Sequence, residues 1–284
     1  MTNTPPTTGS NVPRFLYGTA WKELTTQSLT ELAIQQGFRG IDTANQRKHY
    51  FEAAVGAAIA TCIEQGLVTR DDLFLQTKFT FRHGQDQRLP YNPEAPINTQ
   101  VAQSFASSLQ HLGTDRIDSY VLHGPSRSTG LGVDDWAAWQ AMEELHDSGQ
   151  VRMLGISNVN LDQLTELFQR ARIRPQFVQN RCYAIQRWDR GVRQCCQDNG
   201  AVYQGFSLLT ANRTVASSSQ LTTVAQRCGR SPAQVIFRFA LHLGMLPLTG
   251  TTNAAHMRAD LDVDQFNLED SEIELIENLL LHSV

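Results

Sequence analysis

Apolar and polar residues alternate along the chain as short apolar runs separated by longer amphipathic segments. Eight runs are rich in aromatic, β-branched and leucine side chains and are bounded by glycine or polar residues, which is typical of buried strands. They span residues 14–21, 38–44, 73–79, 117–123, 151–157, 175–181, 201–207 and 244–250. A segment with helical periodicity follows each run, so the pattern predicts eight strand-helix units.

Three of the amphipathic segments carry clear helix signals. Residues 49–66 place apolar side chains at helical spacing and end on a glycine, which favours a helix stop. In residues 231–244, Ser231 stands three residues before Gln234 with a proline between them, which is a capping-box arrangement. A last amphipathic segment covers residues 268–281.

The alternation predicts an α/β fold of the (β/α)8 TIM barrel type. Eight strand-helix units over roughly 250 residues match the size of such a barrel, and no low-complexity linker divides the chain. A doubly wound open sheet has the same alternation, but no G-x-G-x-x-G motif follows the first run. We therefore expect one barrel domain over residues 14–284, after a Thr-, Pro- and Asn-rich flexible tail over residues 1–13.

Composition and charge narrow the class of partner. The net charge of the 284 residues is −4 without acidic or basic blocks, so neither nucleic acid nor an anionic membrane is an expected partner. No apolar run is long enough for a membrane span, and the N-terminus lacks the pattern of a signal peptide. We expect a soluble cytoplasmic protein, by default monomeric, with a small-molecule ligand.

The cysteines predict no metal site and no disulfide framework. Their number is odd, no C-x-x-C motif occurs, and no histidine stands at metal-ligand spacing from Cys62, Cys182, Cys195, Cys196 and Cys228. Cys195 and Cys196 are adjacent and could form a redox pair, although cysteine more often acts as a small core residue.

Lys78 is the most unusual residue of the apolar runs. Alternation along residues 73–79 places it with Gln76 on one face, inside a segment that is otherwise apolar. A lysine is seldom buried without a partner, and Asp42, at the end of another run, could supply the counter-charge. Such a pair would lower the pKa of a neighbouring phenol, for which Tyr50 is the candidate. Tyr50 could instead be a packed aromatic of the first helical turn.

Further polar residues stand at the ends of the runs, where a barrel holds its chemistry. They are His123, Ser157, Asn158, Gln179, Asn180, Ser207, Thr249 and Thr251. Each alone has a plain structural explanation, since Asp42 or Asn158 could cap a helix and His123 could be a hydrogen-bonded core residue. Their joint position at one end of the barrel favours a functional site.

These residues lie in motifs whose order resembles that of the aldo-keto reductases. The motifs are "GFRGIDTA", "TKF", "RIDSYVLHGP", "GQVRMLGISN", "PQFVQNR", "GFSLL" and "LTGTT", and the resemblance runs from Phe15 to about Leu281. It implies a barrel that binds a nicotinamide nucleotide without a Rossmann domain and reduces carbonyl compounds by hydride transfer from NADPH.

The resemblance also implies residue roles. Asp42, Tyr50, Lys78 and His123 would form a catalytic tetrad in which Tyr50 donates the proton, the Lys78–Asp42 pair lowers its pKa, and His123 orients the carbonyl. Predicted cofactor contacts are Thr19, Ala20 and Asp42, then Ser157, Asn158 and Gln179 at the carboxamide, Phe206 stacked on the nicotinamide, Ser207 and Leu208 at the pyrophosphate, and Thr249, Thr251, Thr252, Asn253 and His256 at the adenosine and its 2′-phosphate. The substrate pocket would include Trp21, Tyr50 and His123.

The chain departs from the family pattern at several positions. Asp42 and Tyr50 are eight residues apart instead of the usual five, and counting back from the next helix puts His49 in the tyrosine register. Leu248 replaces a lysine common in NADPH-dependent members, so NADH use stays open beside NADPH. Gly124 and Thr80 replace bulky aromatics. Together with the lack of a long C-terminal tail, these replacements predict a shallow, open pocket for small aldehydes, dicarbonyls and activated ketones.

Two other functions fit the same residues. A lysine inside a barrel could form a Schiff base with a carbonyl substrate, but this needs a neutral amine, which Asp42 opposes. The chain could also be a regulatory or sensor protein that binds the nicotinamide nucleotide and turns over little, because a fold and site can persist without activity.

Overall fold

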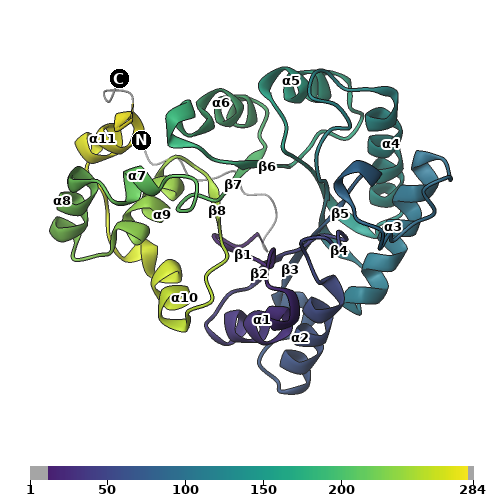
Figure 1. Cartoon of the computed structure of the whole chain (residues 1–284), viewed down its shortest axis with the longest axis horizontal. Coiled ribbons are helices and arrows are strands. Elements are labelled where there is room, and N and C mark those ends of the chain that lie inside the picture. The colour runs from purple at the N-terminus through teal and green to yellow at the C-terminus, as the bar shows by residue number, and fades with distance from the viewer. Residues whose placement is uncertain (1–11, 281–284) are drawn as a thin grey trace.

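The computed structural model describes residues 12–280, which form a closed barrel of eight parallel strands surrounded by helices (Figure 1). Neighbouring strands follow the chain order, and β1 pairs with β8 to close the ring. The strands are β1 (Leu16–Gly18), β2 (Gly40–Asp42), β3 (Phe74–Phe79), β4 (Ile117–Leu122), β5 (Val151–Ser157), β6 (Phe177–Arg181), β7 (Val202–Phe206) and β8 (Leu246–Thr249). The predicted single-domain (β/α)8 barrel is confirmed.

At least one α-helix follows each strand. The helices are α1 (Thr26–Gln35), α2 (Glu52–Glu64), α3 (Ile97–Leu112), α4 (Val133–Asp147), α5 (Leu161–Arg170), α6 (Arg190–Asp198), α7 (Arg213–Ala216), α8 (Ser219–Cys228), α9 (Pro232–His242), α10 (Ala254–Leu261) and α11 (Asp270–Asn278). In Figure 1 they form the outer layer around the strands. None of the helices within residues 12–280 is both long and apolar enough to cross a membrane.

Every predicted strand exists, although most are shorter than the apolar run that predicts them. Residues 14–21 contain only the three-residue β1, because the chain leaves the sheet there and Trp21 adopts a left-handed backbone conformation with φ of 63°. A barrel strand ends where its neighbour no longer pairs, whereas the apolar run continues into the loop that packs over the barrel end.

The predicted helix signals correspond to real helix ends. Ser231 caps α9, its Oγ accepting from the backbone N–H of Gln234 while Gln234 Oε1 accepts from the backbone of Ser231. Gly66 lies just beyond α2 with φ of 69°, a conformation that glycine adopts without steric cost.

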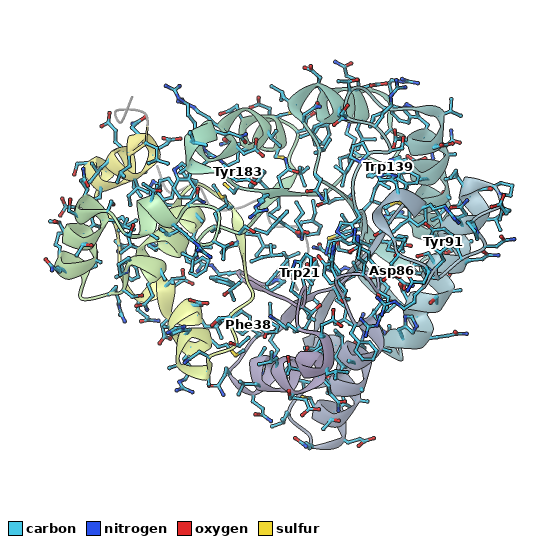
Figure 2. All side chains as sticks on the ribbon, in the orientation of Figure 1. Trp21, Phe38, Asp86, Tyr91, Trp139 and Tyr183 are labelled. Carbon is cyan, nitrogen blue, oxygen red and sulfur yellow. The ribbon has the colours of Figure 1, made fainter. Side chains whose placement is uncertain are left out.

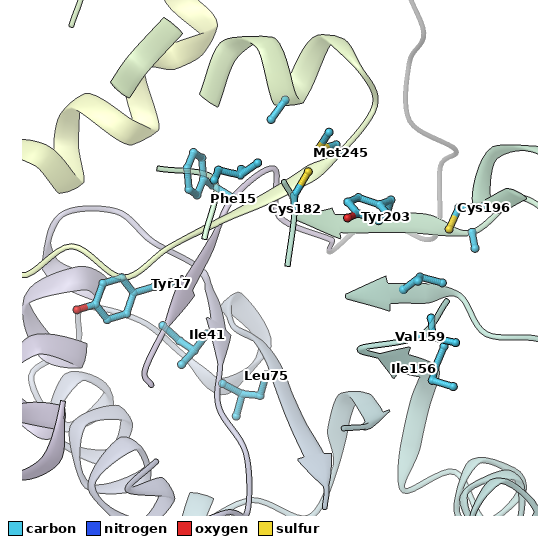
Figure 3. Close-up of a cluster of buried hydrophobic side chains, with 14 of the residues drawn as sticks. Phe15, Tyr17, Ile41, Leu75, Ile156, Val159, Cys182, Cys196, Tyr203 and Met245 are labelled. Carbon is cyan, nitrogen blue, oxygen red and sulfur yellow. The ribbon is translucent and has the colours of Figure 1, made fainter. Parts of the chain in front are cut away.

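The two faces of the strands pack into different hydrophobic clusters. Outward side chains such as Tyr17, Ile41 and Leu75 pack with the helices in the main hydrophobic core (Figure 3). Phe74 and Phe177 belong to a smaller apolar cluster with members from most of the strands, and their rings pack edge to face at 5.6 Å. This cluster fills the barrel beneath the polar residues described next.

The predicted flexible tail, residues 1–13, lies outside the described residues except for its last two positions. Val12 packs against the smaller apolar cluster.

Candidate active site

Lys78 lies fully buried inside the barrel and forms the predicted ion pair with Asp42. Its Nζ donates to both Asp42 carboxylate oxygens, at 2.7 and 2.8 Å, and to the backbone carbonyl of Thr43 at 2.8 Å. Burial lowers the pKa of Lys78, and the Asp42 carboxylate opposes this shift by favouring the ammonium form. The capping explanation of Asp42 is wrong, since its carboxylate binds side chains within the barrel.

Three glutamine side chains form a hydrogen-bond network around this ion pair. Gln76 and Gln179 each donate to Asp42 Oδ1, at 2.7 and 3.0 Å, and each also donates to Gln204 Oε1. Gln204 donates back to Gln76 at 2.9 Å. A buried charge is tolerated when its hydrogen-bonding capacity is met, and this network meets it for Asp42. Gln204 has no counterpart among the sequence predictions because nothing in its apolar run distinguishes it.

Tyr50, and not His49, faces the ion pair. Lys78 Nζ lies 5.2 Å from the centroid of the Tyr50 ring, and the rings of Tyr50 and His123 lie 5.8 Å apart in an edge-on arrangement. The His49 ring instead packs on Trp21 in a tilted arrangement, with centroids 3.9 Å apart, and the His49 backbone carbonyl accepts from the Trp21 backbone N–H. The lengthened loop thus brings Tyr50 to the place where the sequence predicts a phenol.

The electrostatic prediction for Tyr50 is wrong in sign. Burial raises the pKa of the Tyr50 hydroxyl above its usual range, and the Asp42 carboxylate raises it further. The Lys78 ammonium does not reverse this because its charge is matched by two carboxylate contacts from Asp42. Tyr50 is therefore held in the protonated form, which is the form that a proton donor needs.

His123 is held as a neutral imidazole. Burial and the nearby Lys78 charge lower its pKa well below the usual value. Its Nδ1 lies 2.7 Å from the Thr80 hydroxyl oxygen. This contact fixes the ring orientation and is a second role that the sequence does not reveal for Thr80.

A cavity of about 370 Å³, here called the inner cavity, opens beside these side chains at the C-terminal end of the strands. Most predicted site residues line it: Ala20, Trp21, Asp42, Tyr50, His123, Ser157, Asn158, Gln179, Phe206, Ser207, Leu208, Thr249 and Thr251. Trp21 is exposed, and Figure 2 shows it near the middle of the ring of strands, over the barrel mouth.

Four predicted cofactor residues lie elsewhere. Thr19 is fully buried, and its hydroxyl donates to the Asp42 carbonyl at 3.0 Å without lining the inner cavity. Thr252, Asn253 and His256 are exposed around the start of α10, where the Asn253 side chain accepts from the backbone of His256. They could meet only a ligand that extends beyond the inner cavity.

The polar end of the inner cavity has free acceptor groups. Gln179 uses its amide N–H groups on Asp42 and Gln204, which leaves Oε1 without a partner among the described residues. Asn158, at a left-handed φ of 52°, donates to the His123 carbonyl at 2.7 Å and to Ser157 Oγ, and its own Oδ1 likewise stays unpartnered within residues 12–280. The capping explanation of Asn158 is wrong, because Asn160 caps the next helix instead.

Leu248 lines the inner cavity where the family pattern has a lysine. Arg258 does not replace that charge, since its guanidinium donates to Gln36 Oε1 on the outside of the barrel.

A second cavity, here called the mouth cavity, measures about 770 Å³ and shares His123 and Asn158 with the inner cavity. Gly124 and Thr80, the two replacements of bulky aromatics, both line it. The space that larger side chains would fill is thus open next to the candidate reacting centre.

The cysteines take no part in either cavity. All five are unpaired, and Cys196 is buried in the main core, as its explanation as a core residue requires. Across residues 12–280 no group of three or more His, Cys, Asp or Glu side chains is arranged to hold a metal ion.

The chain matches the model of a known protein family. The model of the Aldo/keto reductase family matches residues 17–281. The chain belongs to the aldo-keto reductase family. The predicted family, fold and enzyme class are confirmed, and this aldo-keto reductase is an oxidoreductase.

Individual relatives are distant but cover most of the chain. The aldo-keto reductase AKR2E4 of Bombyx mori is 30% identical over 258 residues, which cover 86% of this chain and 79% of that protein. Its crystal structure in complex with NADP aligns with a TM-score of 0.81 at 26% identity, covering 97% of this chain and 91% of that one. The 9,11-endoperoxide prostaglandin H2 reductase of Trypanosoma cruzi is 27% identical over 256 residues, covering 89% and 82% of the two chains.

Proposed function

We propose that this aldo-keto reductase uses NADPH to reduce small aldehydes, dicarbonyls and activated ketones to alcohols, with Tyr50 as the proton donor. The observation that carries the proposal is the convergence of Tyr50, His123 and the Lys78–Asp42 pair on the inner cavity. NADH stays an alternative cofactor because Leu248 supplies no charge for a phosphate.

The inner cavity fits a nicotinamide nucleotide. Gln179 Oε1 and Asn158 Oδ1 are free to accept from the two N–H groups of the carboxamide, and the Phe206 ring lines the same cavity for stacking. Ser207 and Leu208, and Thr249 with Thr251, line the wall along which the rest of the nucleotide would extend. NADPH, when bound, supplies the hydride.

The protein's own groups handle the proton. Tyr50 is protonated at neutral pH, so its hydroxyl can donate to the carbonyl oxygen as negative charge develops there. Neutral His123 can offer its Nε2–H as a second hydrogen-bond donor to that oxygen. Lys78, with Nζ 5.2 Å from the centroid of the Tyr50 ring, offsets part of the unfavourable effect that burial and the Asp42 carboxylate have on the phenolate left after transfer.

The test follows NADPH oxidation, by its absorbance, with a panel of small aldehydes, dicarbonyls and ketones. We expect Tyr50→Phe to lower kcat by about a hundred- to ten-thousandfold, the usual contribution of general acid catalysis. His49→Phe, which tests the alternative register, should cause a much smaller loss. Tyr183→Phe removes a phenol that lines neither cavity and serves as the control.

Two results would contradict the proposal. Full activity of Tyr50→Phe would remove Tyr50 as the proton donor. Cofactor binding, seen as fluorescence quenching, without turnover of any carbonyl by the wild type would favour the nucleotide-sensor function instead. A monomeric cytoplasmic enzyme remains a prediction, to be tested by light scattering and cell fractionation.

A further inference from the structure

The mouth cavity carries one permanent charge. Its lining includes the histidines His49, His83 and His123 but no aspartate or glutamate, and Arg127 is its only lysine or arginine. Within residues 12–280 no carboxylate forms an ion pair with Arg127, whereas the exposed Arg170 and Arg172 each have an acidic partner. A cation that lines a cavity without a counter-ion is available to an anionic ligand.

Arg127 lies in a loop that is anchored by hydrogen bonds. The Asp135 carboxylate accepts from the backbone N–H of Ser126 at 2.6 Å and from its hydroxyl at 2.8 Å. The Gln163 side chain donates to the carbonyls of Arg127 and Gly130, each at 3.0 Å. These contacts tie the loop to α4 and α5, so a ligand that binds Arg127 does not have to order the backbone first.

Asp135, the carboxylate that anchors this loop, forms no ion pair with Arg127. Asp135 is buried, and all of its hydrogen bonds go to the loop, including one from the Gly132 backbone at 2.7 Å. Its role is to hold the loop in place.

Arg127 and the candidate reacting centre share a cavity lining, because His123 and Arg127 both line the mouth cavity. His123 lines both cavities, and Gly124, the next residue, has no side chain to separate them. Arg127 follows His123 by four residues, so their Cα atoms lie at most about 14 Å apart even along an extended chain. Both residues line the mouth cavity, so a substrate in that cavity has His123 and Arg127 in the same lining.

We propose that Arg127 binds the carboxylate of an aldehyde substrate whose carbonyl lies at Tyr50 and His123, so that the enzyme prefers carboxylate-bearing aldehydes. The inference rests on the proposed reductase function and specifies its substrate class. A guanidinium matches a planar carboxylate through two parallel N–H···O bonds, which a neutral ester cannot reproduce.

The test compares para-formylbenzoate with its methyl ester, and succinic semialdehyde with butanal, as substrates of the wild type and of Arg127→Gln. The wild type should favour each carboxylate over its neutral partner. Arg127→Gln should lower kcat/KM for the carboxylates on the order of tenfold, mainly through KM, and leave the neutral substrates within about twofold. The preference of the wild type should weaken as salt is added.

Two further variants serve as controls. Arg127→Lys keeps the charge but loses the bidentate geometry, so part of the preference should remain. Arg174→Gln makes the same charge change on an exposed residue before β6, at the opposite end of the barrel, and should leave the preference unchanged.

Calorimetric binding of para-formylbenzoate and its ester in the presence of NADP separates this inference from the proposed function. Tighter binding of the carboxylate that disappears in Arg127→Gln, without turnover of either substrate, would overturn the reductase function and support the anion site. Equal affinity and equal kcat/KM ratios in wild type and Arg127→Gln would overturn the role of Arg127.

Discussion

The barrel interior and the mouth cavity hold their cations in opposite ways. Lys78 is fully buried, and the protein itself supplies its counter-charge through Asp42 and the hydrogen bonds around it. Arg127 is exposed in the mouth cavity, and none of the described residues supplies it with an acidic partner. Removing a charge from water costs several kcal/mol, so a buried cation must be paired in the folded protein. A cation in contact with solvent stays hydrated and needs no partner until a ligand binds.

This difference separates a general part of the site from a specific part. Under the proposed mechanism, the paired charge acts next to Tyr50 and serves every carbonyl substrate. The unpaired charge can act only on a substrate that carries an anion. Variants inside the barrel should therefore affect all substrates and also stability, while variants at the mouth should affect selectivity.

Breaking the interior pair should give the largest effect. Lys78→Met leaves the Asp42 carboxylate buried without its cation, which should lower the free energy of unfolding by about 3–5 kcal/mol and abolish carbonyl reduction. The double variant Asp42→Asn/Lys78→Met removes both charges and should recover much of the stability but no activity. Urea unfolding and NADPH oxidation measure the two effects.

Lys48→Met is the matched control, because Lys48 is exposed and forms no ion pair with any described residue. It should change the free energy of unfolding by no more than about 0.5 kcal/mol. If Lys78→Met were as stable as Lys48→Met, the view that the interior pair supports the fold would have to be abandoned.

Asp260 is an intermediate case, a buried acid that forms no ion pair with a cation among residues 12–280. It is 4% exposed, and burial raises its pKa to about 7, although a hydrogen bond with the Thr249 hydroxyl favours the carboxylate and opposes part of this shift. The folded state therefore binds a proton more tightly than the unfolded state. The resulting stabilisation is full below about pH 4 and is lost as the pH rises toward 7.

Asp260→Asn mimics the protonated acid at every pH. It should match the wild type near pH 4 and exceed its free energy of unfolding by about 2–4 kcal/mol at pH 8, from thermal or urea unfolding across this range. Asp270→Asn, on the exposed first turn of α11, is the control and should show no such trend. A difference between Asp260→Asn and wild type that is independent of pH would show that Asp260 is not the titrating group.

The sequence predicts the fold and the interior pair well because both follow from local patterns. Eight apolar runs separated by amphipathic segments are sufficient for the barrel, and a lysine within such a run requires a partner, which Asp42 provides. The capping box of α9 is likewise local, since it depends on residues three apart.

Features that depend on contacts between distant segments could not be predicted. The loop before Tyr50 is held by the Asn45 side chain on the Ser104 carbonyl and by the Gln46 side chain on the Gly84 carbonyl. Its register therefore depends on residues far along the chain. The pKa of Tyr50 depends on how far the folded barrel shields its hydroxyl from water and on the nearby Asp42 carboxylate, and the sequence prediction has the wrong sign for that reason.

The smallest effect is expected at the border between the two cavities, where Thr80 contacts His123. If the Thr80 hydroxyl donates to His123 Nδ1, the ring proton stays on Nε2, which is then the donor that faces the carbonyl. Thr80→Val keeps the shape and removes the hydroxyl, so the ring can also take the other tautomer. We expect kcat to fall about tenfold for charged and neutral substrates alike, with little change in cofactor affinity.

The pH profile distinguishes this role of Thr80 from simple packing. A hydrogen bond donated to Nδ1 favours neutral His123, so its loss should raise the pKa of His123 and move the acidic limb of the kcat profile to higher pH. Thr80→Ser keeps the hydroxyl and should restore both the rate and the profile. If Thr80→Ser shows the same loss as Thr80→Val, retaining the hydroxyl is not sufficient, and the packing of the Thr80 side chain, not its hydrogen bond to His123, is what matters.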